Sequence, residues 1–420
     1  MTLPSQQPPR VAIACGGTGG HLFPGLAIAE QLVLRGCALT VIVSPKDVDQ
    51  QAVKTATGMD IFTLPAVGLQ AGGKIAFLRG FWQSYRASKR LFQRQAPWAV
   101  LAMGGFTGAP PILAAKKLGA RTFLHESNAV PGRANRWLAW VVDRGFVGFA
   151  GAATALDRCE IVVTGTPVRS QFKRRDAATC RTALGLDPTR PVLLVMGGSQ
   201  GAHAINQLLL ESLPTLAQRV PGLQWLHLTG SLEANKVKEA YAALNLRAVV
   251  HPFLGEMELA LGAATAAVGR AGASSLAELA AMRVPALLVP YPAATDHHQL
   301  RNARAFEATG AALLLEQSTV TPDTLARRIA ELVGDQRRQG QMQAALAQWH
   351  HPHAAEQIAQ AMLDATGARS GEAEPPQRGS GAFHPPEPSE RARGARSPLL
   401  VPQMAAPPQP LTAALERLNR

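Results

Sequence analysis

The chain has 420 residues, of which 47% are hydrophobic and 17% are charged, so it is long enough to bury two ordinary cores rather than one. Its four cysteines contain no CxxC pair, which excludes a disulfide framework and a typical zinc site and fits a reducing compartment. The segment MTLPSQQPPR lacks the apolar core of a signal peptide, and no run reaches the roughly 18 apolar residues of a spanning helix, so we expect a soluble or peripheral protein.

The formal net charge is +13, which by itself suggests a nucleic-acid or membrane-surface partner. The charge is unevenly distributed. Residues 61–125 contain no Asp or Glu but nine Lys or Arg, whereas the Pro-rich segment 366–420 contributes little of the excess. We therefore assign the basic character to the folded body.

The first predicted element is an apolar strand at Val11–Cys15, followed by the sequence GGTGG at 16–20 and then directly by a helical pattern. Glycines permit positive φ and close approach of another molecule, and the first N–H groups of a helix face an anion. This pattern favours a diphosphate-binding loop, the alternative being a tightly packed strand-helix turn. The dinucleotide fingerprint G-x-G-x-x-G is excluded because Leu22 stands where it needs a glycine, and a P-loop is excluded because Gly-Lys-Ser/Thr is missing.

Further strands are expected in the first half, in alternation with helices, at 39–43, 61–64, 99–102, 122–124 and 145–147. This alternation predicts a parallel, doubly wound α/β sheet, whose ligands collect at the carboxyl ends of the strands. Three such ends carry unusual sequences: GGTGGH at 16–21, GGFTGAP at 104–110 and HESN at 125–128.

The pattern restarts about 180 positions later, where an apolar strand at 191–196 runs into GGSQGAH at 197–203. Strands follow near 225–228, 248–250, 265–268, 285–289 and 311–314. We predict two Rossmann-like domains with a cleft between them, at 8–165 and 166–350, then a C-terminal helix at 351–365 and a disordered Pro-rich tail at 366–420.

Seven stretches resemble the MurG family of bacterial cell-wall glycosyltransferases, which have the GT-B fold. They are GGTGGHLFPGLAIA, MGGFTGAPP, LHESNAVPGRANRWL, TGTPVR, GGSQGAHAIN, GRAGASSLAEL and VPALLVPYPAATDHHQLRNA, and the match covers residues 10–365. The resemblance implies an inverting transfer of N-acetylglucosamine from UDP-GlcNAc to the MurNAc 4-hydroxyl of undecaprenyl-diphosphate-linked muramoyl pentapeptide, lipid I becoming lipid II. It also implies a peripheral enzyme on the cytoplasmic face of the bacterial plasma membrane, with no cofactor and no metal.

The resemblance also assigns binding residues. The acceptor diphosphate is expected at Gly16, Gly17, Thr18, Gly104 and Gly105. UDP-GlcNAc is expected at Thr18, Gly19, Gly20, Asn128, Arg169, Ser199, Gln200, Leu254, Ala273, Ser274, Ser275, Glu278, His298 and Gln299.

Within that donor set, the resemblance places Ala273–Ser275 at the phosphates, Glu278 on the ribose hydroxyls and the main chain near Leu254 at uracil. Arg169 is expected to add positive charge near the diphosphate, the alternative being a solvated linker arginine. Whether His298 or Gln299 contacts the sugar stays open.

The transfer needs a base for the attacking hydroxyl and charge stabilisation for the departing diphosphate. His21 is the first candidate because it ends the glycine loop and its ordinary pKa lies near neutrality. Glu126 is the rival candidate, and a purely structural His21 is the alternative to both. Asp47-Val48-Asp49 matches the D-x-D signature of metal-dependent glycosyltransferases, but we interpret this acidic pair as the start of a helix at Asp47.

A membrane surface is predicted at Lys74, Ile75, Leu78, Phe81 and Trp82, where an apolar helix side lies between basic residues. The alternative is that this side packs on the sheet. Two other functions stay open: a UDP-GlcNAc epimerase of the same architecture, and a basic nucleic-acid-binding protein, for which the acid-free stretch 61–125 is the only support.

Overall fold

The computed structural model describes residues 8–46, 49–50, 53, 57–65, 69–198 and 202–367, all within the unit Met1–Glu372. Side chains are left undescribed at 69–72, 74 and 366–367. The predicted tail at 366–420 therefore lies almost wholly outside the described residues.

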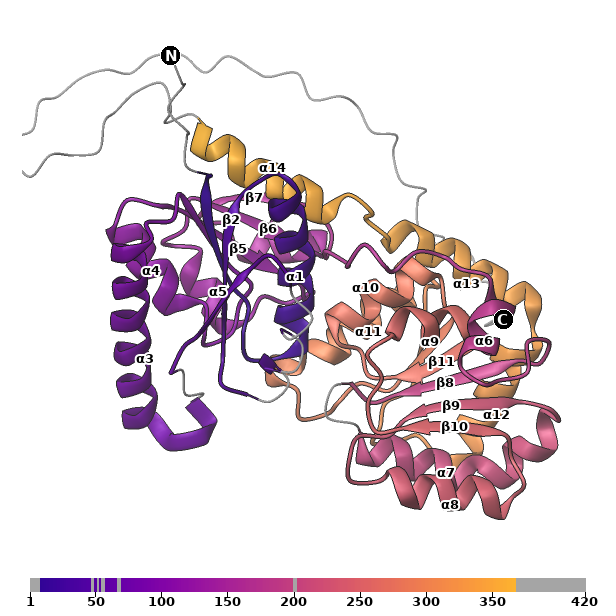
Figure 1. The fold of residues 1–420 in the computed structure, drawn as a ribbon. Helices are drawn as coiled ribbons and strands as arrows, with labels where there is room; N and C mark the ends of the chain where they lie inside the picture. The colour runs from indigo at the N-terminus through magenta and orange to yellow at the C-terminus, as the bar shows by residue number, and fades with distance from the viewer. Residues whose placement is uncertain are drawn as a thin grey trace, which may run out of the picture. The chain divides into compact units, whose positions relative to one another are not determined.

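The first half forms a seven-stranded parallel sheet in the order β3-β2-β1-β4-β5-β6-β7 (Figure 1). Its strands are β1 (Arg10–Ala14), β2 (Ala38–Val43), β3 (Asp60–Thr63), β4 (Ala99–Ala102), β5 (Arg121–Glu126), β6 (Arg144–Val147) and β7 (Glu160–Val163). The six predicted strands are confirmed to within two residues at their ends, while β7 was missed. β7 is a four-residue edge strand whose side chains are mostly exposed, and its short apolar run Ile161-Val162-Val163 leads directly into Thr164-Gly165-Thr166-Pro167, where the alternation of strand and helix pauses.

The second half forms a six-stranded parallel sheet in the order β10-β9-β8-β11-β12-β13. Its strands are β8 (Val192–Met196), β9 (Gln224–Leu228), β10 (Ala248–His251), β11 (Ala266–Gly269), β12 (Ala286–Leu288) and β13 (Leu313–Leu314). All six were predicted. The central strands β8 and β9 are buried at every position, as helices on both faces of a parallel sheet require.

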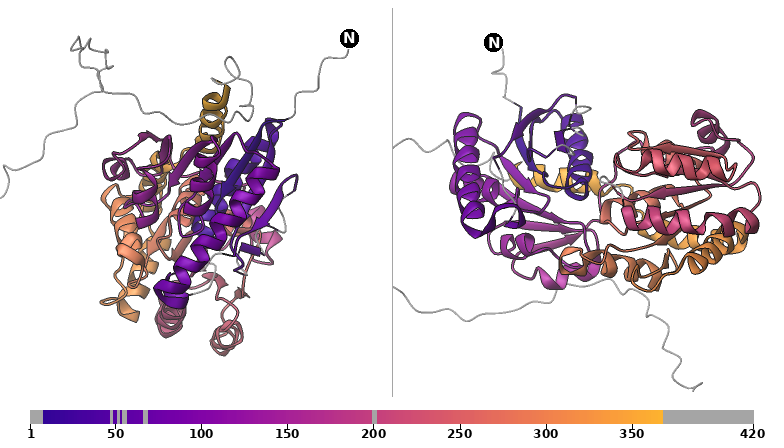
Figure 2. Two further views of the ribbon diagram at one scale, coloured as in Figure 1. Left: turned by 90° about the vertical axis from the view of Figure 1, so that its left-hand side faces the viewer. Right: turned by 90° about the horizontal axis from the view of Figure 1, so that it is seen from below.

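The helices of the first half are α1 (Gly19–Leu34), α3 (Leu69–Arg94), α4 (Ala109–Lys117), α5 (Arg133–Leu138) and the 3-10 turn η2 (Ala150–Ala155). Helix α4 packs on β4 and β5, and the long helix α3 lies beside α4 (Figure 2). One face of α3 is therefore held by α4.

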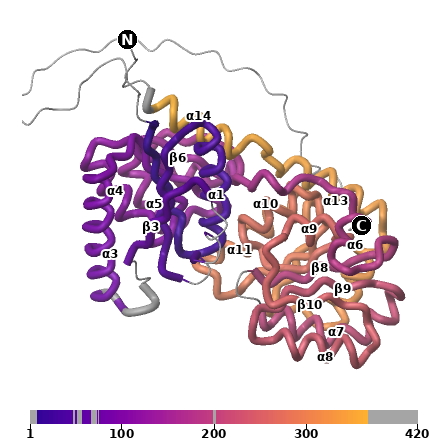
Figure 3. The backbone as a smooth tube through the Cα atoms, viewed as in Figure 1, coloured from indigo at the N-terminus to yellow at the C-terminus, as the bar shows by residue number. Residues whose placement is uncertain are grey.

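The helices that follow are α6 (Ala177–Ala183), α7 (His203–Arg219), α8 (Ala234–Ala243), α9 (Met257–Ala263), α10 (Ala273–Met282), η3 (Thr295–His297), α11 (His298–Ala308), α12 (Pro322–Gly334), α13 (Gln336–Trp349) and α14 (Ala354–Gly367). Helix α14 lies along α1 of the first half (Figure 3). Its residues Ile358 and Met362 are fully buried in the same apolar cluster as Leu22 and Leu32 of α1. The predicted helix at 351–365 thus completes the core around the first sheet, although the sequence alone did not assign it a partner.

Candidate functional site

Each sheet has one position where the strand order changes direction, between β1 and β4 in the first and between β8 and β11 in the second. The connections from the two central strands leave on opposite sides at such a point, and the crevice outside the carboxyl ends of the strands is where doubly wound sheets bind ligands. The glycine sequences at 16–20 and 104–105 follow β1 and β4, that at 197–198 follows β8, and Gly272 follows β11, which itself ends in Gly269. The sequence-predicted loops therefore lie at both switch points.

The first glycine loop has a backbone that only glycine fits. A Cβ atom on Gly16 would collide with the Ser44 nitrogen, and Gly17 has a φ of +114°. Helix α1 starts at Gly19 after the N-cap Thr18, whose side chain makes no cap hydrogen bond. The N–H groups of Gly19 and Gly20 occupy the first turn, where a helix offers them no acceptor, so they are available to an anion.

The second glycine loop lies against the first. Thr107 Oγ1 donates a hydrogen bond of 2.5 Å to the Gly16 carbonyl. The His21 ring faces Gly104 and Gly105, because Cβ atoms built on these glycines would lie 3.2 Å and 3.1 Å from ring atoms of His21. The five residues expected at the acceptor diphosphate are thus brought together around His21.

His21 lies in the first turn of α1, with Nδ1 3.3 Å from Thr18 Oγ1. Burial lowers the pKa of His21, and the nearby charge of Glu126 opposes that shift. The ring is then neutral at neutral pH, which is the form that can take a proton from a hydroxyl group.

Glu126, at the end of β5, is buried and has both carboxylate oxygens fully engaged. Oε1 accepts hydrogen bonds from the backbone and side-chain nitrogens of Asn128, and Oε2 accepts from the Gly132 nitrogen and from Asn135 Nδ2, all at 2.9 Å. Four donors occupy the lone pairs that a general base would need free. This geometry favours a positioning role for Glu126.

Asn302 of α11 connects this segment to the second half. Its Oδ1 accepts from the Ala129 nitrogen at 2.8 Å, and its Nδ2 donates to Asn128 Oδ1 at 3.0 Å and to the Ala271 carbonyl at 3.2 Å. Asn302 is fully buried. The loop after β11 and the loop after β5 are therefore joined through one side chain, which sequence reasoning did not single out.

The donor loop after β11 contains residues expected at the phosphates. Helix α10 begins at Ala273 after the N-cap Gly272, and Ser274 and Ser275 occupy its first turn. Ser274 Oγ lies 3.3 Å from the Gly20 carbonyl, to which it donates a hydrogen bond. The expected donor and acceptor loops thus meet at Ser274 and Gly20. Ser199 and Gln200 lie outside the described residues.

Arg169 and Glu278 are close together, with Arg169 Nη2 3.8 Å from Glu278 Oε1. The Arg169 guanidinium also lies over the rings of Phe23, at 4.5 Å, and Phe172, at 5.0 Å, which argues against a freely solvated linker arginine. Burial raises the pKa of Glu278 to about 7, although the Arg169 charge acts in the opposite direction. The carboxyl group of Glu278 therefore ionises near neutral pH.

His298 and Gln299 open α11. Gln299 Oε1 accepts from the Tyr291 nitrogen at 2.9 Å, and His298 Nδ1 lies 2.7 Å from the Thr295 carbonyl. Both side chains have one end engaged, leaving Gln299 Nε2 and His298 Nε2 as the ends able to meet a sugar hydroxyl. Leu254, expected near uracil, is half-buried and packs against the core.

Helix α3 carries the predicted membrane surface. Ile75, Leu78 and Trp82 are 84%, 58% and 58% exposed. Phe81 is half-buried and packs against the core, so it offers less of its side chain to a membrane than Ile75, Leu78 and Trp82 do. The Lys74 side chain lies outside the described residues. Within the described part of the chain, no helix is long and apolar enough to cross a membrane.

The acidic pair Asp47 and Asp49 was predicted to start a helix, and residues 49–50 are helical. Asp47 lies outside the described residues, but Asp49 is fully buried and its Oδ2 accepts from the nitrogens of Gly17, at 2.6 Å, and Ser44, at 3.1 Å. Among the described residues, no group of three His, Cys, Asp or Glu side chains is arranged to hold a metal ion. Sequence reasoning missed Asp49 as a support of the glycine loop, and only its spacing after β2 could have indicated it.

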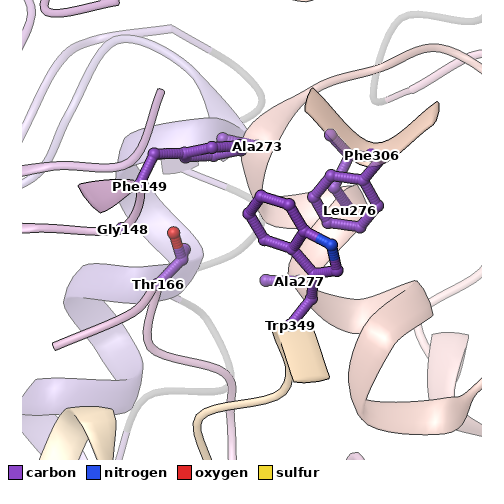
Figure 4. A pocket seen from close by; sticks show the side chains of 8 residues that line it. All are labelled: Gly148, Phe149, Thr166, Ala273, Leu276, Ala277, Phe306 and Trp349. Atoms are coloured by element: carbon purple, nitrogen blue, oxygen red, sulfur yellow. The ribbon is translucent and has the colours of Figure 1, made fainter. Parts of the chain in front are cut away.

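A small, mostly apolar pocket lies beside the first turns of α10 (Figure 4). Its lining residues are Gly148, Phe149, Thr166, Ala273, Leu276, Ala277, Phe306 and Trp349. The rings of Phe306 and Trp349 stack with their centroids 4.3 Å apart, and Phe149 lies 5.2 Å from Trp349. Among the labelled residues only Thr166 and Trp349 have polar side-chain atoms, and Trp349 Nε1 donates to Thr309 Oγ1 at 2.8 Å, so the pocket is lined mainly by apolar groups.

The chain matches two family models, the glycosyltransferase family 28 N-terminal domain over residues 11–147 and the family 28 C-terminal domain over residues 192–358. With two parallel-sheet α/β halves and a loop site at each switch point, the chain is a GT-B glycosyltransferase that uses a UDP-sugar.

Comparison with similar proteins identifies the family of glycosyltransferases to which the chain belongs. The crystal structure of MurG from Acinetobacter baumannii is 28% identical, with a TM-score of 0.67 over 85% of this chain and 100% of that chain. The protein of Anaeromyxobacter dehalogenans strain 2CP-1, named "UDP-N-acetylglucosamine--N-acetylmuramyl-(pentapeptide) pyrophosphoryl-undecaprenol N-acetylglucosamine transferase", is 35% identical over 90% of this chain and 100% of its own length. A protein of the same name from Geobacter sulfurreducens is 35% identical over 78% of this chain and 91% of its own length. The chain belongs to this family of N-acetylglucosamine transferases, the MurG family.

A Listeria monocytogenes structure described as a UDP-N-acetylglucosamine 2-epimerase is also similar, with a TM-score of 0.65 but only 15% identity. At that identity the likeness shows a shared fold alone. The expected resemblance to the MurG family is thus confirmed, and the epimerase alternative has only the architecture in its favour.

Proposed function

We propose that this chain transfers N-acetylglucosamine from UDP-GlcNAc to the MurNAc 4-hydroxyl of undecaprenyl-diphosphate-linked muramoyl pentapeptide, the step that converts lipid I to lipid II. One observation carries the proposal: the glycine loop of the first sheet and the start of α10 in the second meet at Gly20 and Ser274, beside the neutral His21. Two anion-binding loops are what a reaction between two diphosphate-bearing substrates needs.

In this mechanism His21 Nε2 takes the proton of the 4-hydroxyl as its oxygen attacks the anomeric carbon of GlcNAc from the face opposite UDP, so the configuration inverts. The departing UDP carries the negative charge. In this proposal the first N–H groups of α10 and the Arg169 guanidinium offset that charge, and Glu278 accepts hydrogen bonds from the ribose hydroxyls. Glu126 holds Asn128, Gly132 and Asn135 in place through its four hydrogen bonds.

A direct test follows radiolabel from UDP-GlcNAc. Transfer predicts label in a lipid fraction that depends on added lipid-linked acceptor. Label that is converted to an epimeric sugar, free or nucleotide-linked, with none in the lipid fraction would favour the epimerase alternative, and label that remains in unchanged UDP-GlcNAc would contradict both activities.

We further propose that α3 places the enzyme on the cytoplasmic face of the plasma membrane as a peripheral protein, with no role in binding nucleic acid. The support is the exposed row Ile75, Leu78 and Trp82, spaced at i, i+3 and i+7 on one side of the helix. Exposed basic residues lie on the same helix at Arg79, Arg86 and Arg90. Each basic residue near an anionic leaflet adds about 1 kcal/mol.

Vesicle binding tests this surface. A Leu78→Ser, Trp82→Ser double variant should bind anionic vesicles more weakly and lose activity on a full-length lipid acceptor, while a short-chain soluble acceptor is affected much less. Leu232→Ser is the matched control, because Leu232 is 97% exposed in the second half. Equal vesicle binding by the double variant and the parent would place the membrane surface elsewhere.

A further inference from the structure

The glycine loop after β1 is held from outside by side chains that the reaction described above does not use. Asp49 Oδ2 accepts the Gly17 N–H at 2.6 Å, and Lys46 Nζ donates to the Gly17 carbonyl at 2.9 Å. Both the N–H and the carbonyl of Gly17 are therefore hydrogen-bonded to side chains of the turn that follows β2, those of Asp49 and Lys46.

This turn is itself braced. Asp49 Oδ2 also accepts from the nitrogen and the hydroxyl of Ser44, at 3.1 Å and 2.5 Å, and the Lys46 nitrogen lies 3.4 Å from Ser44 Oγ. The backbone nitrogens of Asp49 and Gln50 donate to the Lys46 carbonyl at 3.0 Å. Asp49 is fully buried, so it fixes the turn as well as the loop.

The consequence for anion binding is specific. Because Asp49 takes the Gly17 N–H, this group is not available to a diphosphate, and the loop can offer only the N–H groups that come after it, at the start of α1. A buried carboxylate next to an anion site also opposes anion binding unless a cation lies nearby. Lys46 is such a cation: it is exposed, and its ammonium lies 5.5 Å from the centre of the Phe106 ring, in the second glycine loop.

We propose that Lys46 is the charged contact to the diphosphate of the lipid-linked acceptor. Asp49 is then the positioning residue that holds Lys46 and the glycine loop after β1 in place. The inference rests on the proposed function for the identity of the acceptor. One Lys46 N–H remains on the Gly17 carbonyl, and the other two ammonium donors are free to meet phosphate oxygens between the two glycine loops.

Three substitutions at Lys46 separate this role from a merely structural one. Lys46→Gln keeps a donor for the Gly17 carbonyl but removes the charge, Lys46→Arg keeps both, and Lys46→Met removes both. Lys117→Met serves as the control, because Lys117 is an exposed lysine on α4 of the same half. Melting temperatures identify any variant that fails to fold.

The primary measurement is the equilibrium affinity for farnesyl diphosphate, with farnesyl monophosphate for comparison, followed by KM for a lipid-linked acceptor and for UDP-GlcNAc. Loss of one charge-assisted contact predicts that Lys46→Gln and Lys46→Met weaken farnesyl diphosphate binding and raise the acceptor KM by about tenfold. The UDP-GlcNAc KM should stay within about twofold, and Lys46→Arg should recover most of the affinity. Asp49→Asn, with a shape close to the wild type, should raise the acceptor KM without changing the donor KM.

Normal affinity and normal acceptor KM in Lys46→Gln would overturn the inference, since the lysine would then serve only the Gly17 carbonyl. An equal rise in both KM values would also overturn it. If the wild type transfers no sugar, the proposed function fails instead, and farnesyl diphosphate binding still decides whether Lys46 contacts a diphosphate.

Discussion

Replacement of Glu126 by Gln separates its positioning role from the rival role of general base. Each carboxylate oxygen of Glu126 accepts two hydrogen bonds, one from a backbone N–H group, which cannot reverse, and one from the side-chain amide of Asn128 or Asn135. The orientations of these two amides are set by their further hydrogen bonds to Asn302 Nδ2 and to the His125 carbonyl. The introduced glutamine would place an NH₂ group against two of these four donors, whichever way its amide turns.

The magnitude follows from the burial of the site. Glu126 is 3% exposed, so the two displaced donors lose their partners without gaining water. Each buried unsatisfied donor costs about 1–3 kcal/mol, which gives roughly 2–6 kcal/mol of lost stability for the two. In a protein of this size the melting temperature should fall on the order of 5 °C or more.

Thermal unfolding of Glu126→Gln measures this loss directly, with Glu160→Gln as the control. Glu160 is an exposed carboxylate paired with Arg144 at 2.8 Å, and its replacement should change the melting temperature by less than about 1 °C. An unchanged melting temperature in Glu126→Gln together with a kcat loss of about 10²-fold or more would refute the positioning argument, because that result is typical of a group that handles the proton itself.

Three further outcomes are expected. His21→Asn should lower kcat by about 10²-fold or more while UDP-GlcNAc binding stays near normal, and wild-type turnover would remove His21 from the mechanism. Folding raises the pKa of Glu278 from 4.5 to about 7. Between these pH values the folded state keeps a proton that the unfolded state releases, so the ionisation of Glu278 makes the wild type less stable as the pH rises. Urea denaturation should therefore show that Glu278→Gln loses less stability than the wild type between about pH 5 and about pH 8, and parallel curves of stability against pH would contradict the raised pKa. In the same variant the UDP-GlcNAc KM should rise more than kcat falls. A protein that ends at Gly367 should keep the melting temperature and activity of the full chain, because residues 366–420 have the composition of a segment without a core; a drop of several degrees would mean that the tail docks.

The sequence alone determined the architecture and the position of the loops. Strands such as β1 and β8 consist mainly of apolar residues and are followed by glycines, and this local pattern is enough to predict a parallel sheet with a ligand site at the carboxyl ends. The motifs also indicated the family, which the similar proteins confirmed.

Only the tertiary structure decided which side chains support those loops. Asp49 reaches Gly17 from 32 positions away, and Asn302 reaches Asn128 from 174 positions away, so no local pattern marks either contact. The surroundings of Phe81 and Glu126 could not be predicted from the sequence for the same reason. Helical spacing placed Phe81 beside an exposed row but could not show that the core occupies its side of the helix, and a carboxylate in the sequence HESN looks reactive until its four donors are in place. Hydrogen bonds and burial depend on neighbours distant in sequence, and those neighbours exist only once the chain has folded.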